Sequence, residues 1–409
     1  MKPLRLAAVA THPIQYQVPI FRLLASDPDV AFRAFFASRI GLDGSLDDEF
    51  GVKLAWDLPL DEGYPHTFLH NLTPVATTAR FSGLDCPDIE DELRSGRFHA
   101  VLVPAYRSRF YLQAIRAALR ARIPILYRPT ITDLDVDDAP WKKLPRATFL
   151  SWLYRRISVF LAVGENARRH FLRHGVPEDR IVFSPHCVDN ALYQRQAQHW
   201  MPRRDDTRRQ LRFPPDRFVF LFSGKLSPRK DPLVLLRAAA VCRLRDRLGL
   251  LFLGDGPQRA ELETTAASIL PGRSAFVGFQ NQSMIGKYYA ASDCLVLPSL
   301  AGETWGLVVN DAMNFGLPAI VSDRVGCAPD VVREGHSGYT FPAGSAAALA
   351  ARLDALLSSP SRACAMGAAA RRLVASYSPE AAADGIRRAL LLLYQGKPSR
   401  ERHAAPVRC

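Results

Sequence analysis

Short apolar runs alternate with amphipathic segments along most of the chain. Six runs in the first half are rich in β-branched or aromatic residues and short enough to be strands: 4–10, 31–37, 100–104, 124–128, 159–164 and 181–185. Six similar runs follow in the second half: 218–224, 248–254, 274–279, 294–299, 318–323 and 338–344. Buried strands separated by helical patterns are typical of parallel sheets with crossover helices. The pattern therefore predicts an α/β protein with two doubly wound, Rossmann-like domains.

A polar, charged and proline-containing segment separates the two sets of strands, and we interpret residues 198–215 as a linker. The first domain is then 1–197 and the second 216–377, each of a size that folds alone. Residues 378–395 have the pattern of a final amphipathic helix, which we expect to pack back toward the first domain. Residues 396–409 are expected to be disordered. Ligands of such sheets bind outside the carboxyl ends of the strands, so the loops after each strand are the places to search.

Composition agrees with a soluble globular protein of about two domains. The chain has 409 residues, of which 48% are hydrophobic and 23% charged. No apolar stretch approaches the ~18 residues that a transmembrane helix needs. Lys2, Arg5 and the Ala8–Ala10 tripeptide imitate a signal peptide, but the apolar core between them is too short. We therefore predict a cytoplasmic protein.

Cysteine spacing and net charge limit which covalent links, metal sites and partners we expect. The seven cysteines are scattered and include no C-x-x-C pair, which favours reduced thiols over a disulfide framework or a zinc site. The formal net charge of +13 requires an anionic partner: nucleic acid, an acidic lipid surface or a phosphorylated ligand. No recognised nucleic-acid-binding motif is present, so nucleic acid is not expected.

Two glycine-containing loops follow strands of the second half. In SGKLSPRKD (223–231), Gly224 permits a tight turn, and Lys225 and Lys230 place cations near a helix N-terminus, which suits a diphosphate. A solvated basic turn is the alternative. GDGP (254–257) reads more readily as a plain tight turn than as a binding loop.

The segment ETWGLVVNDAMNFG (303–316) combines an apolar helix with two acids. Its only polar stripe is Asn310, Asp311 and Asn314, which must face water, a partner or a ligand because an unpaired buried carboxylate is costly. Glu303 lies ahead of Gly306 at the mouth of the helix, where backbone N–H groups could meet a phosphate or a sugar hydroxyl. Alternatively, Glu303 only favours the helix N-terminus and Asp311 is solvated.

This segment, continuing to Gly316-Leu-Pro, resembles the E-x7-E motif of glycosyltransferase family 4. The resemblance extends over most of the chain through SGKL…K, GDGP, VGF (277–279), YYAASDCLVLPS (288–299) and VGCAPDVVREGHSGYTF (325–341), in the family's order. It implies a GT-B fold, with two Rossmann-like domains facing across a cleft. It also implies retaining transfer of a sugar from a nucleotide donor without a bound metal.

The resemblance assigns roles on the donor side. Lys225 and Lys230 would hold the donor diphosphate, and Glu303 would contact hydroxyls of the donor sugar. Asp311 replaces the family's second glutamate, which meets the ribose, with a side chain shorter by one methylene. Phe279 would lie near the base. Five further positions complete the predicted substrate-binding set, which includes the backbone over the phosphates: Gly224, Thr304, Trp305, Gly306 and Leu307.

Candidate residues of the first half follow strand ends. His12 and Gln15, in THPIQYQVP (11–19), could hydrogen-bond a sugar from the acceptor side of the cleft. Arg128 could balance charge on the departing phosphate, and a surface ion pair is the alternative. His186, near the domain junction, is predicted to bind substrate or to act only as a hinge residue.

The stretch WKKLPRATFLSWLYRR (141–156) interleaves basic and aromatic residues. It could lie on an anionic membrane surface, or pack its aromatics on the first sheet with its basic residues in water. No carboxylate pair in the second half is spaced to hold a donor's metal, and the D-V-D at 135–137 lies in the first half.

We predict a metal-independent, retaining glycosyltransferase in the cytoplasm, either free or peripheral at the inner face of the membrane. It would transfer a hexose-type sugar from a UDP-sugar or GDP-sugar to a saccharide or lipid-linked acceptor, in synthesis of a cell-surface polysaccharide or glycolipid. One alternative is a sugar-nucleotide epimerase of the same architecture. Another is a glycosyltransferase-like binding subunit without turnover.

Overall fold

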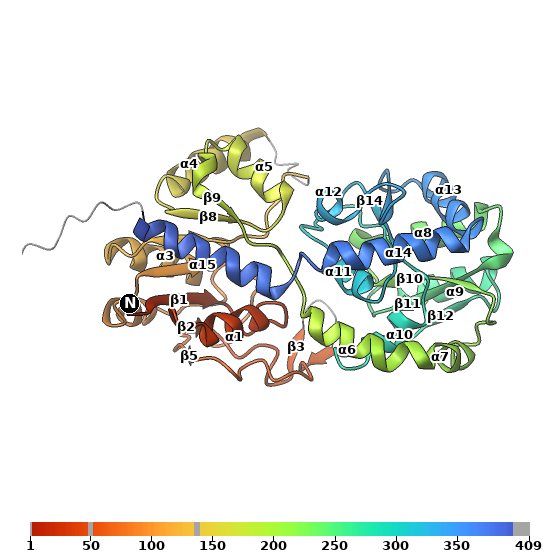
Figure 1. The fold of residues 1–409 in the computed structure, drawn as a ribbon, viewed down its shortest axis with the longest axis horizontal. Helices are drawn as coiled ribbons and strands as arrows, with labels where there is room; N and C mark the ends of the chain where they lie inside the picture. Colours follow the sequence, from red (N-terminus) through yellow and green to blue (C-terminus); the bar gives the residue numbers. More distant parts are fainter. Residues whose placement is uncertain (1, 48–51, 135–139, 396–409) are drawn as a thin grey trace, which may run out of the picture.

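A computed structural model of the chain describes residues 2–47, 52–134 and 140–395. Two α/β units lie end to end, and the last long helix runs along the first unit (Figure 1). The predicted fold class is confirmed. The tail 396–409, expected to be disordered, and the D-V-D at 135–137 lie outside the described residues.

The first sheet is parallel throughout, in the order β5-β2-β1-β6-β7-β8-β9. Leu4 pairs with Val30 and Leu6 with Ala100, so the first strand lies between its two neighbours. Its strands are β1 Leu4–Ala10, β2 Val30–Phe36, β5 His66–Phe68, β6 Ala100–Val103, β7 Ile125–Tyr127, β8 Val159–Ala162 and β9 Ile181–Phe183. The predicted runs correspond to these strands within a residue or two at each end. Most of β1 and all of β6, β7 and β8 are buried, as apolar strands covered on both faces should be.

Helices cover both faces of this sheet. They are α1 Val18–Ser26, α2 Ile89–Ser95, α3 Arg109–Arg120, α4 Pro140–Tyr154 and α5 Glu165–Arg173. The side chain of Ser108 caps α3 by accepting a hydrogen bond from the backbone N–H of Tyr111. The short strand β5 and a small antiparallel pair, β3 Ser45–Asp47 with β4 Val52–Leu54, were not predicted from the pattern.

The second sheet is also parallel, in the order β12-β11-β10-β13-β14-β15. Its strands are β10 Phe218–Ser223, β11 Leu248–Leu253, β12 Ser274–Phe276, β13 Cys294–Leu297, β14 Ala319–Ser322 and β15 Gly338–Phe341. Its helices are α8 Pro232–Val241, α9 Arg259–Ile269, α10 Ile285–Ala290, α11 Leu307–Asn314, α12 Ala328–Val331, α13 Ala346–Leu357 and α14 Pro360–Val374. The order places β10 beside β13, so the loops that follow these two strands leave the same edge of the sheet.

The segment expected to be a linker is largely helical instead. It overlaps α6 Asn190–Trp200 and contains α7 Arg204–Gln210. Arg204 and Arg208 both form ion pairs with Asp293, ahead of β13. Polar composition indicated a linker, and these two ion pairs attach its helix α7 to the second sheet. The exact domain boundaries remain a prediction.

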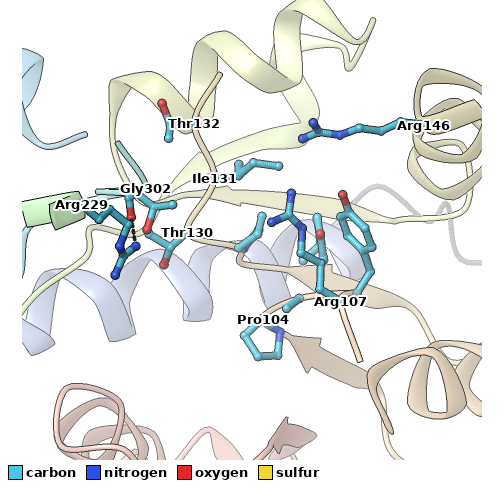
Figure 2. A pocket seen from close by; sticks show the side chains of 13 residues that line it. Pro104, Arg107, Thr130, Ile131, Thr132, Arg146, Arg229 and Gly302 are labelled. Atoms are coloured by element: carbon cyan, nitrogen blue, oxygen red, sulfur yellow. Dashed lines mark hydrogen bonds between the residues drawn. The ribbon is translucent and has the colours of Figure 1, made fainter. Parts of the chain in front are cut away.

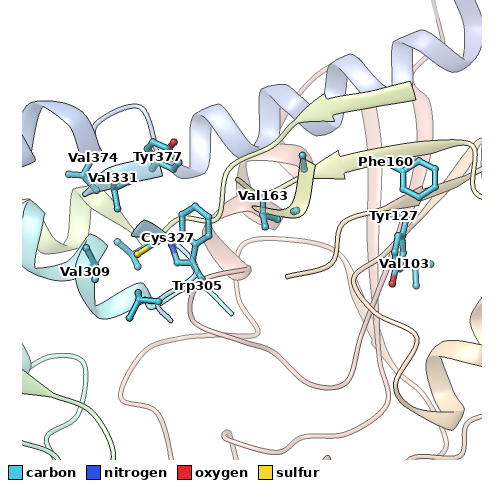
Figure 3. Packing of buried hydrophobic residues seen from close by; sticks show 14 of the residues in the cluster. Val103, Tyr127, Phe160, Val163, Trp305, Val309, Cys327, Val331, Val374 and Tyr377 are labelled. Atoms are coloured by element: carbon cyan, nitrogen blue, oxygen red, sulfur yellow. The ribbon is translucent and has the colours of Figure 1, made fainter. Parts of the chain in front are cut away.

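The chain crosses back to the first unit after α14. Helix α15, Pro379–Gln395, packs against α1, β8 and β9, and Ser184 Oγ donates a hydrogen bond to the carbonyl of Ala382. A continuous apolar cluster joins the two units, and Figure 3 shows Trp305, Val331 and Tyr377 of that cluster close to Val163. Within the part of the chain described, no helix is long and apolar enough to cross a membrane.

Candidate active site

The loops after β10 and β13 bring together three of the predicted catalytic residues. Lys230 Nζ forms an ion pair with Glu303 Oε2, and Ser299 Oγ donates a hydrogen bond to the same oxygen at 3.2 Å. The side chains of Lys230 and Glu303 are only 17% and 12% exposed. Lys225 lies in the same loop as Lys230. The result is a partly buried cation–carboxylate pair at the carboxyl edge of the second sheet.

Glycine backbones hold the lysine loop in place. Gly224 has φ 145°, a conformation that favours glycine. A Cβ atom added at Gly254, in the GDGP loop, would lie 2.0 Å from the Gly224 carbonyl oxygen. The backbone N–H of Gly224 donates to the carbonyl of Leu253 at 2.9 Å. The GDGP loop therefore supports the lysine loop, a role beyond the plain turn that the sequence favoured.

A second tight turn places Glu303 ahead of α11. Gly306, with φ 99°, precedes the first helical residue, Leu307, and a Cβ there would lie 2.9 Å from Leu297. The N–H of Gly326 donates to the carbonyl of Glu303 at 2.9 Å, which ties this turn to the loop after β14. The N–H of Val309 donates to the carbonyl of the N-cap residue Gly306 at 2.9 Å, which leaves the N–H groups of Leu307 and Val308 at the start of α11 suited to an anion.

The side chain of Trp305 points into the junction between the two units. It is 3% exposed, and its Nε1 donates to Asn310 Oδ1 at 2.9 Å. The space beside Gly164 is filled by the Trp305 ring, since a Cβ at Gly164 would lie 2.3 Å from a ring carbon. His186 lies with its ring centroid 5.7 Å from that of Trp305. Among the proposed donor contacts, Trp305 therefore offers its backbone, while its side chain docks the domains.

The polar stripe of α11 is buried and does not face solvent. Asn310, Asp311 and Asn314 are 0%, 7% and 1% exposed. Asn314 Nδ2 donates to Asn190 Oδ1 at 3.0 Å, and the Tyr289 hydroxyl lies 3.4 Å from Asp311 Oδ2. Asp311 Oδ1 accepts no hydrogen bond from the residues described. Burial raises the pKa of Asp311 to about 7. The alternative of a solvated Asp311 is therefore wrong.

The guanidinium of Arg128 is buried beside the loop after β9. It is 8% exposed, and its Nε donates to Ser184 Oγ at 2.9 Å while a terminal nitrogen donates to the Pro185 carbonyl at 2.5 Å. The alternative of a surface ion pair is wrong, since Arg128 is buried and no carboxylate among the described residues contacts its guanidinium. Because Ser184 also bonds to α15, Arg128 helps to hold the returning helix on the first unit, and its role in balancing the charge of the departing phosphate stays a prediction.

His12, Gln15 and His186 lie on loops at the carboxyl edge of the first sheet. His12 Nδ1 is 3.0 Å from Thr11 Oγ1, and Gln15 is half-buried. His186 is 5% exposed, lies edge-on to Tyr16 with centroids 4.9 Å apart, and has Nε2 3.4 Å from Thr130 Oγ1. Burial, followed by the charge of Arg128, lowers the pKa of His186 to about 3, so its imidazole is neutral at neutral pH.

A second set of contacts joins the units on the side of Phe279. The rings of Phe279 and Trp56 have centroids 6.4 Å apart. Asn281 Nδ2 donates to the carbonyl of Ala55 at 2.7 Å, and Ser283 Oγ bonds to Asp57 Oδ2. The residue predicted to lie near the base is thus covered by a loop of the first unit, which sequence reasoning did not identify.

A cavity of about 460 Å³ lies between the loops of both sheets. Figure 2 shows its labelled lining, with Arg229 and Gly302 of the second unit near Thr130, and Arg107 and Arg146 of the first unit on the other side. Sequence analysis did not identify Arg107, Arg146 and Tyr127 as site residues, because single residues on a loop, a helix and a strand end form no motif. Among the residues described, no group of three or more His, Cys, Asp or Glu side chains could hold a metal ion.

Two parallel-sheet α/β domains arranged in this way define a class of architecture, the GT-B fold. The lysine–glutamate pair lies at the carboxyl edge of the second sheet of this fold. Two family profiles match the sequence: "Glycosyl transferases group 1" over residues 203–373 and "Glycosyl transferase 4-like domain" over 49–187. Together they span most of the chain. The chain belongs to the group 1, family-4-like glycosyltransferases, as the sequence motifs indicated.

Individual relatives agree with this assignment. The D-inositol 3-phosphate glycosyltransferase of Thermomonospora curvata is 31% identical over 235 residues, 54% of each chain. The sulfoquinovosyl transferase of Arabidopsis thaliana is 35% identical over 180 residues, 42% of this chain and 33% of its own. The chain thus spans about half or less of the length of these curated relatives. HepE of Anabaena, solved in complex with UDP, has a TM-score of 0.69 at 16% identity, covering 95% of this chain and 100% of its own, which shows a shared fold.

Proposed function

We propose that the protein is a retaining glycosyltransferase that transfers a hexose-type sugar from a UDP-sugar or GDP-sugar to a saccharide or lipid-linked acceptor. The observation that carries the proposal is the Lys230–Glu303 pair at the edge of the second sheet, beside the first turn of α11. Cations and open amides suit a diphosphate, while the carboxylate suits sugar hydroxyls. Solved structures of HepE with UDP and with UDP-glucose favour the uridine donor.

In the proposed reaction, Lys225, Lys230 and the α11 amides hold the diphosphate and stabilise its charge as it departs. Glu303 positions the donor sugar by accepting hydrogen bonds from its hydroxyls. The acceptor oxygen bonds to the anomeric carbon as the bond from that carbon to the diphosphate breaks, and its proton passes to the departing diphosphate. The chemistry then depends on positioning and charge stabilisation supplied by this chain.

The acceptor would enter through the cavity between the domains, within reach of His12 and Gln15 on the first unit. Domain closure would bring these residues toward the donor. Phe279 would lie against the base, and Gly224, Thr304, Gly306 and Leu307 would line the diphosphate. Asp311 could meet the ribose only after its surroundings open, because it is buried in this conformation.

Calorimetric titration of UDP and GDP tests the donor site. Lys230→Met should weaken binding of the preferred nucleotide roughly tenfold or more, since a charge-assisted contact is lost. Lys287→Met is a matched control, because Lys287 bonds to Gln210 on α7 and lies away from the loop. Equal affinities for wild type and Lys230→Met would refute the assignment of the diphosphate site.

Turnover with labelled UDP-glucose separates the alternatives. A transferase releases UDP and forms a product that retains the anomeric configuration when an acceptor is supplied. Conversion of the donor alone to an isomeric sugar nucleotide would instead identify an epimerase. Binding of UDP without release or transfer from any donor tested would identify a binding subunit.

We also propose a cytoplasmic location with peripheral attachment to the inner face of the membrane. Support comes from Trp152 on α4, whose side chain is 40% exposed. The guanidinium of Arg156 lies 4.2 Å from the centroid of the Trp152 ring, so an exposed aromatic and a cation are side by side, as a contact with an anionic lipid surface requires. Leu150, Leu153 and Tyr154 are buried in the core, so only part of 141–156 is available. We expect the protein to sediment with anionic but not with neutral liposomes. Salt should reverse this binding and Trp152→Ala should weaken it. Equal binding to both lipids would refute the proposed membrane attachment.

A further inference from the structure

The start of helix α5 in the first unit is bonded to the segment that follows β14 in the second. Asn166 Nδ2 donates a hydrogen bond to the carbonyl of Gly326 at 2.8 Å. The backbone N–H of Glu165 donates to the carboxylate of Asp330, at 2.9 Å to Oδ1 and 3.2 Å to Oδ2. A carboxylate is a favourable partner there, because the first N–H groups of a helix have no acceptor within it. One side chain from each unit therefore ties α5 to this segment.

The same segment is bonded to the loop that carries Glu303. The N–H of Gly326 donates to the carbonyl of Glu303, and the N–H of Cys327 donates to the carbonyl of Trp305, each at 2.9 Å. A Cβ atom added at Gly326 would lie 2.0 Å from the carbonyl oxygen of Thr304, so the close approach of the two backbones requires glycine. Figure 3 shows Cys327 beside Trp305 at this junction. The two backbones are therefore expected to move together.

A single peptide group connects these two sets of hydrogen bonds. The carbonyl of Gly326 and the N–H of Cys327 belong to one planar peptide group and point in opposite directions. The carbonyl accepts from Asn166, and the N–H donates to the carbonyl of Trp305. A peptide group is rigid, and consecutive hydrogen bonds polarise one another, so a bond made at one end orients the other end. Asn166 thus reaches the backbone of Trp305 through two consecutive hydrogen bonds.

We propose that Asn166, supported by Asp330, is a positioning residue that fixes the loop 303–306 and aligns Glu303 with the donor sugar when the two units are docked. The inference rests on the proposed glycosyl transfer, and it names what orients the carboxylate in that reaction. Positioning matters because a small displacement of a group that contacts the reacting sugar lowers the rate more than it lowers binding. Lys225 and Lys230 follow β10 on a different loop, so binding of the diphosphate should depend less on this link.

The competing explanation is that Asn166 only helps to dock the two units. Other contacts already serve docking: the Trp305 ring fills the space beside Gly164, and the Tyr377 hydroxyl donates to Asp330 Oδ1 at 3.1 Å. If Asn166 only adds to these contacts, its removal should loosen docking and leave the loop 303–306 as ordered as before. If Asn166 positions the loop, its removal should loosen the loop while the units stay docked.

Hydrogen exchange, measured by mass spectrometry on fragments of the full chain, separates these explanations. The N–H groups of Gly326 and Cys327 should exchange roughly fivefold faster or more in Asn166→Ala than in wild type, because their bonds to the loop open more often. The radius of gyration from small-angle scattering should stay unchanged in this variant. Arg168→Gln is the matched control, since Arg168 lies on the same helix, is 40% exposed and bonds to Glu178 of the first unit.

Asp330 supplies a pair of variants that differ only in the contact. Asp330→Ala removes the acceptor for the N–H of Glu165 and should also speed exchange of the N–H groups of Gly326 and Cys327. Asp330→Asn keeps an oxygen at the position of Oδ1, which accepts from both Glu165 and Tyr377, and should restore exchange to the wild-type rate. This rescue would not occur if the charge of Asp330, and not its hydrogen bonds, held the segment.

Steady-state turnover with UDP-glucose measures the consequence for the reaction. Asn166→Ala and Asp330→Ala should lower kcat roughly tenfold, whereas the Kd of UDP, measured by calorimetry, should change by about twofold or less. Asp330→Asn and Arg168→Gln should keep the wild-type kcat. A residue needed only for folding would instead lower kcat and UDP affinity together.

Wild-type exchange of the N–H groups of Gly326 and Cys327 in Asn166→Ala overturns the inference, whatever the behaviour of Asp330→Ala. Faster exchange with an unchanged kcat also overturns it, as does a loss of UDP affinity as large as the loss of kcat. If wild type turns over no donor, the proposed function fails. Exchange in Asn166→Ala then still decides whether the first unit fixes the loop 303–306.

Discussion

Replacing Asp311 with asparagine should stabilise the protein above neutral pH. The carboxylate is 7% exposed, and one of its oxygens has no hydrogen-bond partner in the described structure. Asparagine has nearly the same shape and carries no charge. The Tyr289 hydroxyl, 3.4 Å from Oδ2, can still donate to the amide oxygen. The substitution therefore removes the cost of burying a negative charge with little change in packing.

The size of the effect follows from the pKa of Asp311, raised by burial from an ordinary 3.8 to about 7. Between these values the native state binds a proton that the unfolded chain has released, so wild-type stability falls as pH rises and is constant above about pH 7. Each pKa unit corresponds to about 1.4 kcal/mol, so the full penalty is roughly 4 kcal/mol. About 3 kcal/mol of it should develop between pH 5 and pH 8.

Urea unfolding of wild type and Asp311→Asn at pH 5 and pH 8 measures this directly. Taking the difference between the two proteins cancels other titrating groups, including Asp330, whose pKa burial raises to about 6. We expect the variant's advantage to grow by roughly 3 kcal/mol over this interval. Asp323→Asn is the matched control, since that side chain is 57% exposed and its substitution should show no such pH dependence.

An advantage that is the same at both pH values would refute the argument, because it would mean that Asp311 is hydrated and titrates normally. Titrating both proteins with UDP examines the ribose contact separately. A weakening of roughly 1–3 kcal/mol in Asp311→Asn would show that the carboxylate reaches the nucleotide after the site opens. Unchanged affinity would leave it with a purely internal role.

Three further predictions concern the site. Glu303→Gln should lower kcat strongly and leave UDP affinity nearly unchanged, because the proposed contact of Glu303 is to the transferred sugar. Steady-state kinetics measure kcat and calorimetry measures UDP affinity, with a substitution of the exposed Glu334, Glu334→Gln, as control. Gly164→Ala should displace the Trp305 ring, because a carbon of that ring would lie 2.3 Å from the added Cβ, and so loosen the docking of the two domains. Small-angle scattering would detect the looser docking as a larger radius of gyration, and an unchanged radius would contradict the prediction. Turnover should survive EDTA if Lys225 and Lys230 hold the diphosphate, and loss of activity restored by Mg²⁺ or Mn²⁺ would contradict that role.

Most strands were predictable because each is a short apolar run bounded by turn residues, and strands such as β6, β8, β10 and β11 are buried on both faces and so show no alternation. The same reasoning failed for β3 (SLD), β4 (VKL) and β5 (HTF), which contain polar or charged residues and form no apolar run, unlike the equally short β7, β9 and β12. It also did not identify the helical structure within the proposed linker 198–215. Arg204 and Arg208 instead fold α7 onto Asp293, a partner some 85 residues away in sequence.

Local patterns in the sequence determined the fold class, the lysine loop and the motif that begins at Glu303, because turns, helix starts and strands depend on neighbouring residues. Tertiary structure alone decided that Asp311 is buried, that Arg128 holds α15 and that Gly164 receives the Trp305 ring. It also assembled the cavity of Arg107, Arg146 and Arg229. Burial and charge environment depend on which distant segments meet, and side chains from separate loops acquire a common site only when both sheets are in place.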